Sequence, residues 1–145
     1  MAKTVFTEIE QNTVRAAIQE AEKNTSGEIK VHIENHCKED ALDRAAYIFE
    51  KLDLHETELR NGVLFYLAIK DKQFAILGDV GINLKVPKGF WDEISSLMLN
   101  YFKQGEFALG LSEGVKAAGK ALSEHFPFQK NDINELSDDI SFGDN

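Results

Sequence analysis

The chain has 145 residues, of which 43% are hydrophobic and 28% charged, and its formal net charge is −9. This length and composition are typical of one globular domain and exclude a disordered, collagen-like or membrane-embedded architecture. The negative charge argues against general binding to nucleic acid or to an anionic membrane and favours cations or basic partners.

The cysteine content and the N-terminus indicate the compartment. Cys37 is the only cysteine, so an internal disulfide is excluded, and the first residues lack the long apolar region of a secretory signal. No apolar segment approaches the roughly 18 residues that span a bilayer. We therefore expect a cytoplasmic protein without a membrane anchor. Cys37 follows His36 in a polar turn, where we expect an inert thiol and not a nucleophile.

The first third of the chain predicts a helix, a strand and a second helix. Thr7 and Glu10 form the pattern of a capping box, so the first helix is expected to begin at Glu8. Residues 28–34 alternate strictly between apolar and polar side chains, which predicts a half-buried strand at an edge of the sheet. Asp40 is a suitable N-cap for a second amphipathic helix.

The apolar runs 62–69 and 74–77 predict the core of the protein. They are joined by the polar turn 70–73, as in two antiparallel strands, and the first run is apolar enough to be covered on both faces. A right-handed crossover would place residues 28–34 parallel to the first run. The loops 25–28, 55–62 and 78–83 would then meet at one end of the sheet.

The second half predicts two more helices, at 89–103 and 107–126, the latter ended by Pro127. We expect one domain at 1–127 and an acidic, mobile tail at 128–145, in which residues 140–142 are able to dock as a short strand. The predicted fold class is a three-layer α/β/α sandwich with a small mixed sheet of three to four strands and about four helices.

Acidic and amide side chains gather at the predicted loop cluster. Hard divalent cations take several oxygen ligands from adaptable loops, so this end of the sheet is a candidate metal site, with calcium favoured. The proposed ligands are Glu28, Glu58, Asp79, Asn83, Asp92 and Glu93. Glu56 also lies at this end, and His55 would add a nitrogen ligand for a transition metal. Asp92 and Glu93 have a simpler explanation as acids that complement a helix dipole.

Two further expectations concern charge at this cluster. If its carboxylates repel one another without a cation, then replacing Asp79 by alanine should leave the metal-free protein no less stable. Arg60 is the basic residue nearest to the cluster, where it would either hold a phosphate or brace the hairpin through a salt bridge. The standard motifs of enzymes are absent from the sequence.

Three patterns occur in an order that resembles the TPM domain family. They are Arg60-Asn61-Gly62-Val63-Leu64 with its hairpin, the loop 78–81, and the segment 104–115, which reads QGEFALGLSEGV. The family includes thylakoid-lumen phosphatases, photosystem II repair proteins and a nematode receptor auxiliary protein. The resemblance covers about residues 7–126, and it implies an α/β/α sandwich in a stand-alone, bacterial-type member.

The resemblance also implies a range of functions. One plant branch of the family is associated with acid phosphatase activity, while other members act as assembly or interaction modules. The family's acidic positions correspond to Asp79 and Asp92, but residues 85–91 differ from the plant pattern. We therefore rank a cation-binding module with a metal-ordered partner surface first. A metal-assisted phosphatase is second, and a metal-free interaction domain is third.

Overall fold

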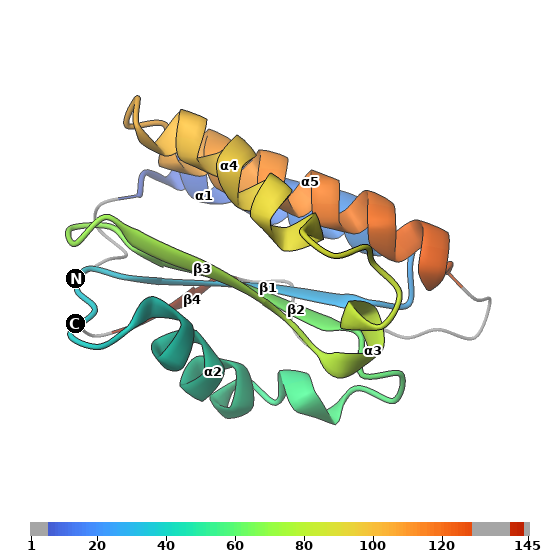
Figure 1. Cartoon of the computed structure of the whole chain (residues 1–145). Coiled ribbons are helices and arrows are strands. Elements are labelled where there is room, and N and C mark those ends of the chain that lie inside the picture. Colours follow the sequence, from blue (N-terminus) through green and yellow to red (C-terminus); the bar gives the residue numbers. More distant parts are fainter. Residues whose placement is uncertain (1–5, 129–139, 144–145) are drawn as a thin grey trace.

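A four-stranded sheet with helices on both faces forms the molecule (Figure 1). The computed structural model describes residues 6–128 and 140–143. Helices α1 (Glu8–Glu22), α4 (Phe90–Phe102) and α5 (Phe107–His125) cover one face of the sheet, and α2 (Ala41–Lys51) covers the other. The three-layer α/β/α sandwich is therefore confirmed. None of the described helices is long and apolar enough to cross a membrane.

The sheet is mixed, with the strand order β3-β2-β1-β4. Strands β1 (Glu28–Glu34) and β2 (Gly62–Ala68) are parallel, and β3 (Gln73–Gly78) is antiparallel to β2. The expected short strand near the C-terminus is β4 (Ser141–Phe142), which pairs in parallel with β1. The rest of the predicted acidic tail, residues 129–139 and 144–145, lies outside the described residues.

Strand β1 differs from its prediction. All seven of its residues are buried, and it lies between β2 and β4 instead of at an edge. The alternating pattern predicted a solvated polar face, but two polar side chains of that face, His32 and Glu34, are buried in a hydrogen-bond network. The prediction of a half-buried edge strand is wrong because the groups that cover this face come from distant segments.

That network surrounds the carboxylate of Glu34, whose side chain is fully buried. Its two oxygens accept hydrogen bonds from Arg44 Nε at 3.1 Å, Arg44 Nη2 at 2.5 Å, Tyr66 Oη at 2.6 Å and His32 Nε2 at 3.2 Å. His32 Nδ1 lies 2.8 Å from Ser141 Oγ, so the network extends to β4. Each oxygen of the buried charge therefore has partners, which offsets the cost of removing it from water.

Burial and hydrogen bonding shift the pKa values of this network in opposite ways. Burial alone would raise the pKa of Glu34, but the hydrogen bonds from Arg44, Tyr66 and His32 outweigh it, and the pKa is lowered. Burial lowers the pKa of His32, and its contact with Glu34 offsets only part of that effect. Folded His32 is therefore neutral at neutral pH.

Local sequence explains the helices. Thr7 and Glu10 make the reciprocal bonds of the predicted capping box, and Asp40 caps α2 through the backbone of Leu42 and Asp43. Two short helical turns occupy segments expected to be loops: the 3-10 turn η2 (Leu54–Glu56) and the four-residue helix α3 (Val80–Asn83). Both lie at the end of the sheet where the three loops were predicted to meet.

The core has two layers, one on each side of β2. Val63, Phe65 and Leu67 pack toward α1, α4 and α5, while Leu64, Tyr66 and Ala68 pack toward α2. This arrangement explains the uninterrupted apolar run of β2, which is covered on both faces. Cys37 packs in the second layer and is buried, although the sequence placed it in a polar turn.

Candidate functional site

The three predicted loops do meet at one end of the sheet. Glu28 pairs with Gly62, and Val63 pairs with Gly78, so the starts of β1 and β2 lie beside the end of β3. Helix α3 and the turn η2 are at this end, on the right in Figure 1. We use the name loop cluster for residues 25–28, 54–62 and 78–84.

Asp79 is the central carboxylate of the loop cluster. Its oxygens accept hydrogen bonds from Arg60 Nε at 2.7 Å and Arg60 Nη2 at 2.9 Å, and Oδ1 also accepts from the backbone N–H of Val80 at 2.8 Å. The side chain of Asp79 is 7% exposed and that of Arg60 is 49% exposed. The hydrogen bonds to Asp79 raise the pKa of Arg60. A buried carboxylate is thus neutralised by a cation that reaches it from solvent.

The position of Asp79 as N-cap of α3 changes one expectation. The sequence suggested that this carboxylate repels its neighbours, so that its removal would not harm the metal-free protein. In the structure it is an acceptor for its own helix and for Arg60. Of the two roles foreseen for Arg60, the salt bridge that braces the hairpin is the one observed.

Backbone contacts hold the segment before β2 against α3. The N–H of Gly81 donates to the carbonyl oxygen of Arg60 at 2.8 Å. A Cβ at Gly81 would overlap the carbonyl oxygens of Leu59 and Arg60, so the close approach requires glycine. Arg60 itself has a φ of 52°, in the left-handed region. These backbone contacts therefore fix the position from which the Arg60 side chain extends to Asp79.

Asn83 links the loop cluster to α4. Its Nδ2 donates to the carbonyl oxygen of Gly78 at 2.8 Å, and its Oδ1 accepts from Trp91 Nε1 at 2.8 Å. Asn83, Trp91 and Asp92 also line an open depression of about 390 Å³. Among the predicted ligands, Asn83 and Asp92 are therefore brought to one place.

A second depression, of about 340 Å³, lies between α2, η2 and the end of β3. Its lining includes Glu50, His55, Arg60 and Asp79. The Nδ1 atom of His55 is buried and has no hydrogen-bond partner among the residues that the structure describes, and His55 Nε2 lies 3.9 Å from Glu56 Oε1. Sequence reasoning had not included Glu50, because it lies on α2 and reaches the loop cluster only through the packing of that helix on β3.

The other proposed ligands are more dispersed. Glu28 is buried at the start of β1, while Glu58, Asp92 and Glu93 are exposed. Asp92 and Glu93 lie in the first turn of α4, as their helix-dipole explanation requires. Within residues 6–128 and 140–143, no group of three or more His, Cys, Asp or Glu side chains is placed to hold a metal ion.

Together, the fold and the loop cluster define the class of protein. It is a small α/β/α domain whose polar loops gather at the N-terminal ends of its parallel strands. The chain belongs to the TPM domain family, because the model of that family matches residues 2–121. The resemblance that the sequence patterns indicated is thus confirmed. A search of curated proteins found no match.

Solved structures resemble the chain to different degrees. The NMR structure of the BA42 protein from the psychrophilic bacterium Bizionia argentinensis has a TM-score of 0.88 and 47% identity, and the match covers 95% of each chain. The N-terminal domain of the cg2496 protein from Corynebacterium glutamicum has a TM-score of 0.64 and 13% identity, over 81% of this chain and 74% of that one. An N-terminal domain from P. gingivalis has a TM-score of 0.69 and 20% identity, over 86% and 82%. The last two share the fold.

Proposed function

We propose that this TPM domain binds a divalent cation, with calcium preferred, at the loop cluster, and that the cation orders a surface for a protein partner. The observation that carries this proposal is the pairing of Asp79 with Arg60. A carboxylate only 7% exposed has as its counter-ion a guanidinium that is half exposed to water. Arg60 thus occupies a place where a bound cation would satisfy the same two oxygens.

The proposed ligand set supplies oxygen donors of the kind that a hard cation takes, and its dispersed members would have to converge on Asp79 when the cation binds. Asn83 supplies an amide oxygen beside Asp92, and Glu28, Glu58 and Glu93 are further acidic side chains of the proposed ligand set. Calcium takes six to eight oxygens in flexible geometry and accepts water among them. Binding would require Arg60 to release Asp79, so the proposed event is an exchange of one cation for another.

Such an exchange would change the loop cluster while leaving the core in place. Arg60 is held to α3 through its own carbonyl oxygen, and α3 is held to α4 through Asn83 and Trp91. A cation that recruits Asp79 and Asn83 would therefore shift the side chains on the surface of α3 and of the segment before β2. We propose that the surface formed by α3 and the segment before β2 is the one that the cation orders for a partner.

The test is a calcium titration of the metal-stripped protein followed by amide and arginine Nε chemical shifts. We expect changes at residues 25–28, 55–62 and 78–83, together with a change of the Arg60 Nε–H signal as it leaves Asp79. Asp79→Asn is the matched control, because asparagine retains the N-cap of α3 and removes the charge. Unchanged spectra at millimolar calcium would refute cation binding and leave the metal-free interaction domain as the explanation.

A further inference from the structure

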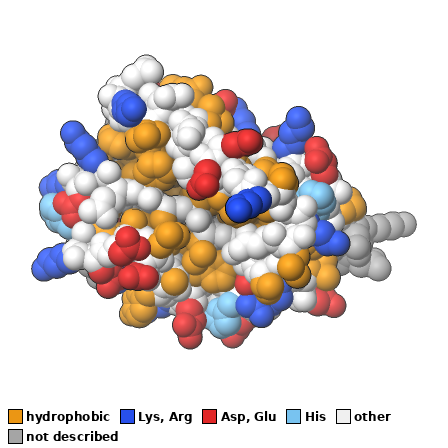
Figure 2. All heavy atoms as spheres, in the orientation of Figure 1, with side chains coloured by type: hydrophobic (Ala, Val, Ile, Leu, Met, Phe, Trp, Pro, Cys, Tyr) orange, Lys and Arg blue, Asp and Glu red, His pale blue; other side chains and the backbone are white. Residues whose placement is uncertain are grey.

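Strand β3 has a free outer edge beside an aromatic groove. In the part of the chain that the structure describes, β3 pairs only with β2, and Figure 2 views the molecule from this side. The N–H of Asp79 donates to the carbonyl oxygen of Gly62. Backbone groups alternate in direction along an antiparallel strand, so those of Phe74 and Ile76 point away from β2.

The groove lies between the hairpin tip and the C-terminal end of α4. Phe74, Leu99, Phe102 and Phe107 line it. The rings of Phe74 and Phe102 meet edge to face with centroids 4.9 Å apart, and Phe102 also contacts Phe107 at 5.4 Å. A Cβ at Gly110 would lie 2.5 Å from the ring of Phe102, so this ring rests directly on the backbone of α5. The apolar floor of the groove is therefore firmly packed.

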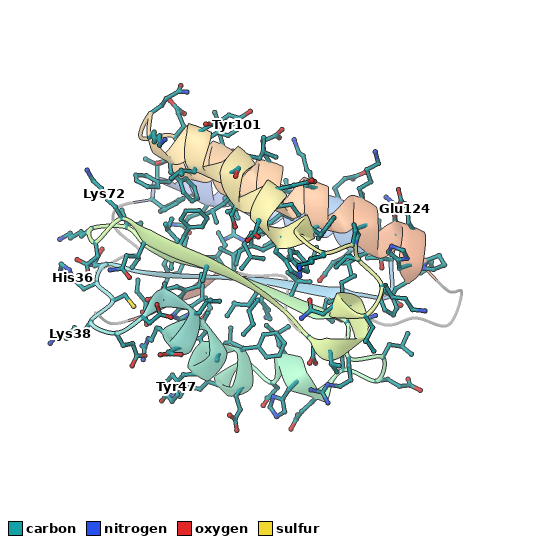
Figure 3. All side chains as sticks on the ribbon, in the orientation of Figure 1. His36, Lys38, Tyr47, Lys72, Tyr101 and Glu124 are labelled. Carbon is teal, nitrogen blue, oxygen red and sulfur yellow. The ribbon has the colours of Figure 1, made fainter. Side chains whose placement is uncertain are left out.

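Two lysines border this apolar floor. Lys72 and Lys103 line the groove, its lining contains no acidic residue, and neither lysine has an ion-pair partner among the described residues. In Figure 3, Lys72 extends from the hairpin tip below the end of α4 that carries Tyr101. Hydrophobic and blue spheres lie together at this corner, at the upper left of Figure 2. On a protein with a net charge of −9, this is a local basic and apolar surface.

The charge and the shape together indicate one kind of occupant. The groove volume is about 110 Å³, somewhat less than the roughly 150 Å³ of a cavity that holds benzene, which suits one aliphatic side chain. The lysines favour carboxylates on either side of that side chain, and the free edge offers backbone hydrogen bonds to an extended chain. We propose that this surface binds an extended segment of a partner protein, which adds a strand to β3, inserts an aliphatic residue into the groove, and carries acids two positions before and after that residue, on the same face of the strand.

Peptide binding tests this proposal without involving the cation site. The probe is a fluorescein-labelled synthetic peptide of alternating Thr and Val with a central Glu-Thr-Leu-Thr-Glu, which puts both glutamates on the face of the leucine, titrated with the full chain and followed by anisotropy. We expect saturable binding that weakens at high salt. In one control peptide, lysines replace the glutamates. In a second, the leucine backbone nitrogen is methylated, which blocks strand pairing and keeps the side chain.

Matched variants of the protein separate the groove from general charge. Lys72→Asn with Lys103→Gln removes both border charges, and asparagine tolerates the positive φ of 54° at residue 72. We expect this pair to weaken binding about tenfold. Lys116→Gln with Lys120→Gln makes the same charge change beside the depression between α1 and α5, and should have no effect.

The outcomes are decisive in both directions. Loss of binding in the groove variant and with the methylated peptide, together with full binding by the α5 variant, supports strand addition by an acidic segment. The proposal is overturned if the wild-type chain does not bind, or if either change leaves binding intact. It is also overturned if sedimentation shows self-association that Lys72→Asn with Lys103→Gln abolishes, because the occupant would then be a second copy.

Discussion

Arg60 and Asp79 form a bidentate ion pair between the segment before β2 and the end of β3, with N–O distances of 2.7 and 2.9 Å. Planar guanidinium groups suit this geometry, and a lysine would provide only a point charge. The pair combines a buried acceptor with a half-exposed donor. In the cation exchange that we propose, the half-exposed arginine would leave and the buried carboxylate would stay in place.

Replacing Arg60 by asparagine should strengthen calcium binding if the proposed exchange occurs. The change removes the competing cation, and asparagine tolerates the left-handed backbone of residue 60. We expect a calcium dissociation constant at least several-fold lower by isothermal titration calorimetry. An unchanged or higher constant would mean that Arg60 does not compete with the cation for Asp79.

Calcium should raise the melting temperature of the wild-type protein and not that of Asp79→Asn. A ligand that binds only the folded state adds about 2.7 kcal/mol at a hundred times its dissociation constant, which shifts a domain of this size by several degrees. Differential scanning calorimetry with and without calcium measures the shift. An equal shift in both proteins would place the cation away from Asp79.

Asp79→Ala should melt lower than Asp79→Asn in the absence of metal. Both variants lose the ion pair with Arg60, but only alanine loses the side-chain acceptor for the N–H of Val80. Loss of an N-cap costs about 1 kcal/mol. Chemical denaturation of the two metal-free variants compares them directly. Equal stability would show that the cap of α3 contributes little.

Acidification should destabilise the protein through His32. Burial lowers the pKa of folded His32 from the ordinary value of 6.5, so below pH 6.5 the unfolded chain binds a proton that the folded chain does not. As the pH decreases, the free energy of unfolding then decreases by up to about 1.4 kcal/mol per pH unit. The lowered pKa of Glu34 acts in the same direction at lower pH, as its carboxylate becomes protonated.

The variant that isolates this effect is His32→Gln, which cannot titrate and whose amide can still donate toward Glu34. Its stability should depend less steeply on pH than that of the wild type between pH 7 and 5. Urea unfolding across this range gives both slopes. Parallel slopes would show that other groups produce the acid sensitivity.

A generic phosphomonoester such as p-nitrophenyl phosphate should not be hydrolysed by the purified protein, with or without calcium or magnesium. In the metal-free protein Arg60 is paired with Asp79 and is not free to hold a phosphate, and the sequence contains none of the standard motifs of hydrolytic enzymes. Turnover measured against Asp79→Asn is the check. Robust turnover lost in that variant would place the phosphatase ahead of the binding module.

Local patterns predicted the elements that local interactions determine. The capping box at Thr7 and Glu10, the hairpin of β2 and β3, and the meeting of three loops followed from spacing alone. The burial of β1 did not, because the partners of its polar side chains come from α2, β2 and β4. Alternating polarity predicts a solvated face unless such distant groups are known.

The loop cluster shows the same limit. The sequence placed acids at the correct end of the sheet, but it could not tell that Asp79 would be saturated by Arg60 and by the backbone of α3. A four-residue helix leaves too short a pattern for periodicity to reveal. Asn83 and Trp91, eight positions apart, are joined by a hydrogen bond. This bond depends on how the start of α4 packs in the folded protein.

The contact between His32 and Ser141 has a consequence for synthesis on the ribosome. These residues are 109 positions apart, and β4 is made after β1, β2 and β3. Strands β1, β2 and β3 emerge together and can pair early, since chains fold from the N-terminus as they are translated. Until Ser141 and Gly143 arrive, the side of β1 that they cover stays open, and the Nδ1 atom of His32 lacks its hydroxyl partner. A nascent chain should therefore gain its final protection from hydrogen exchange at β1 only after β4 has left the ribosome.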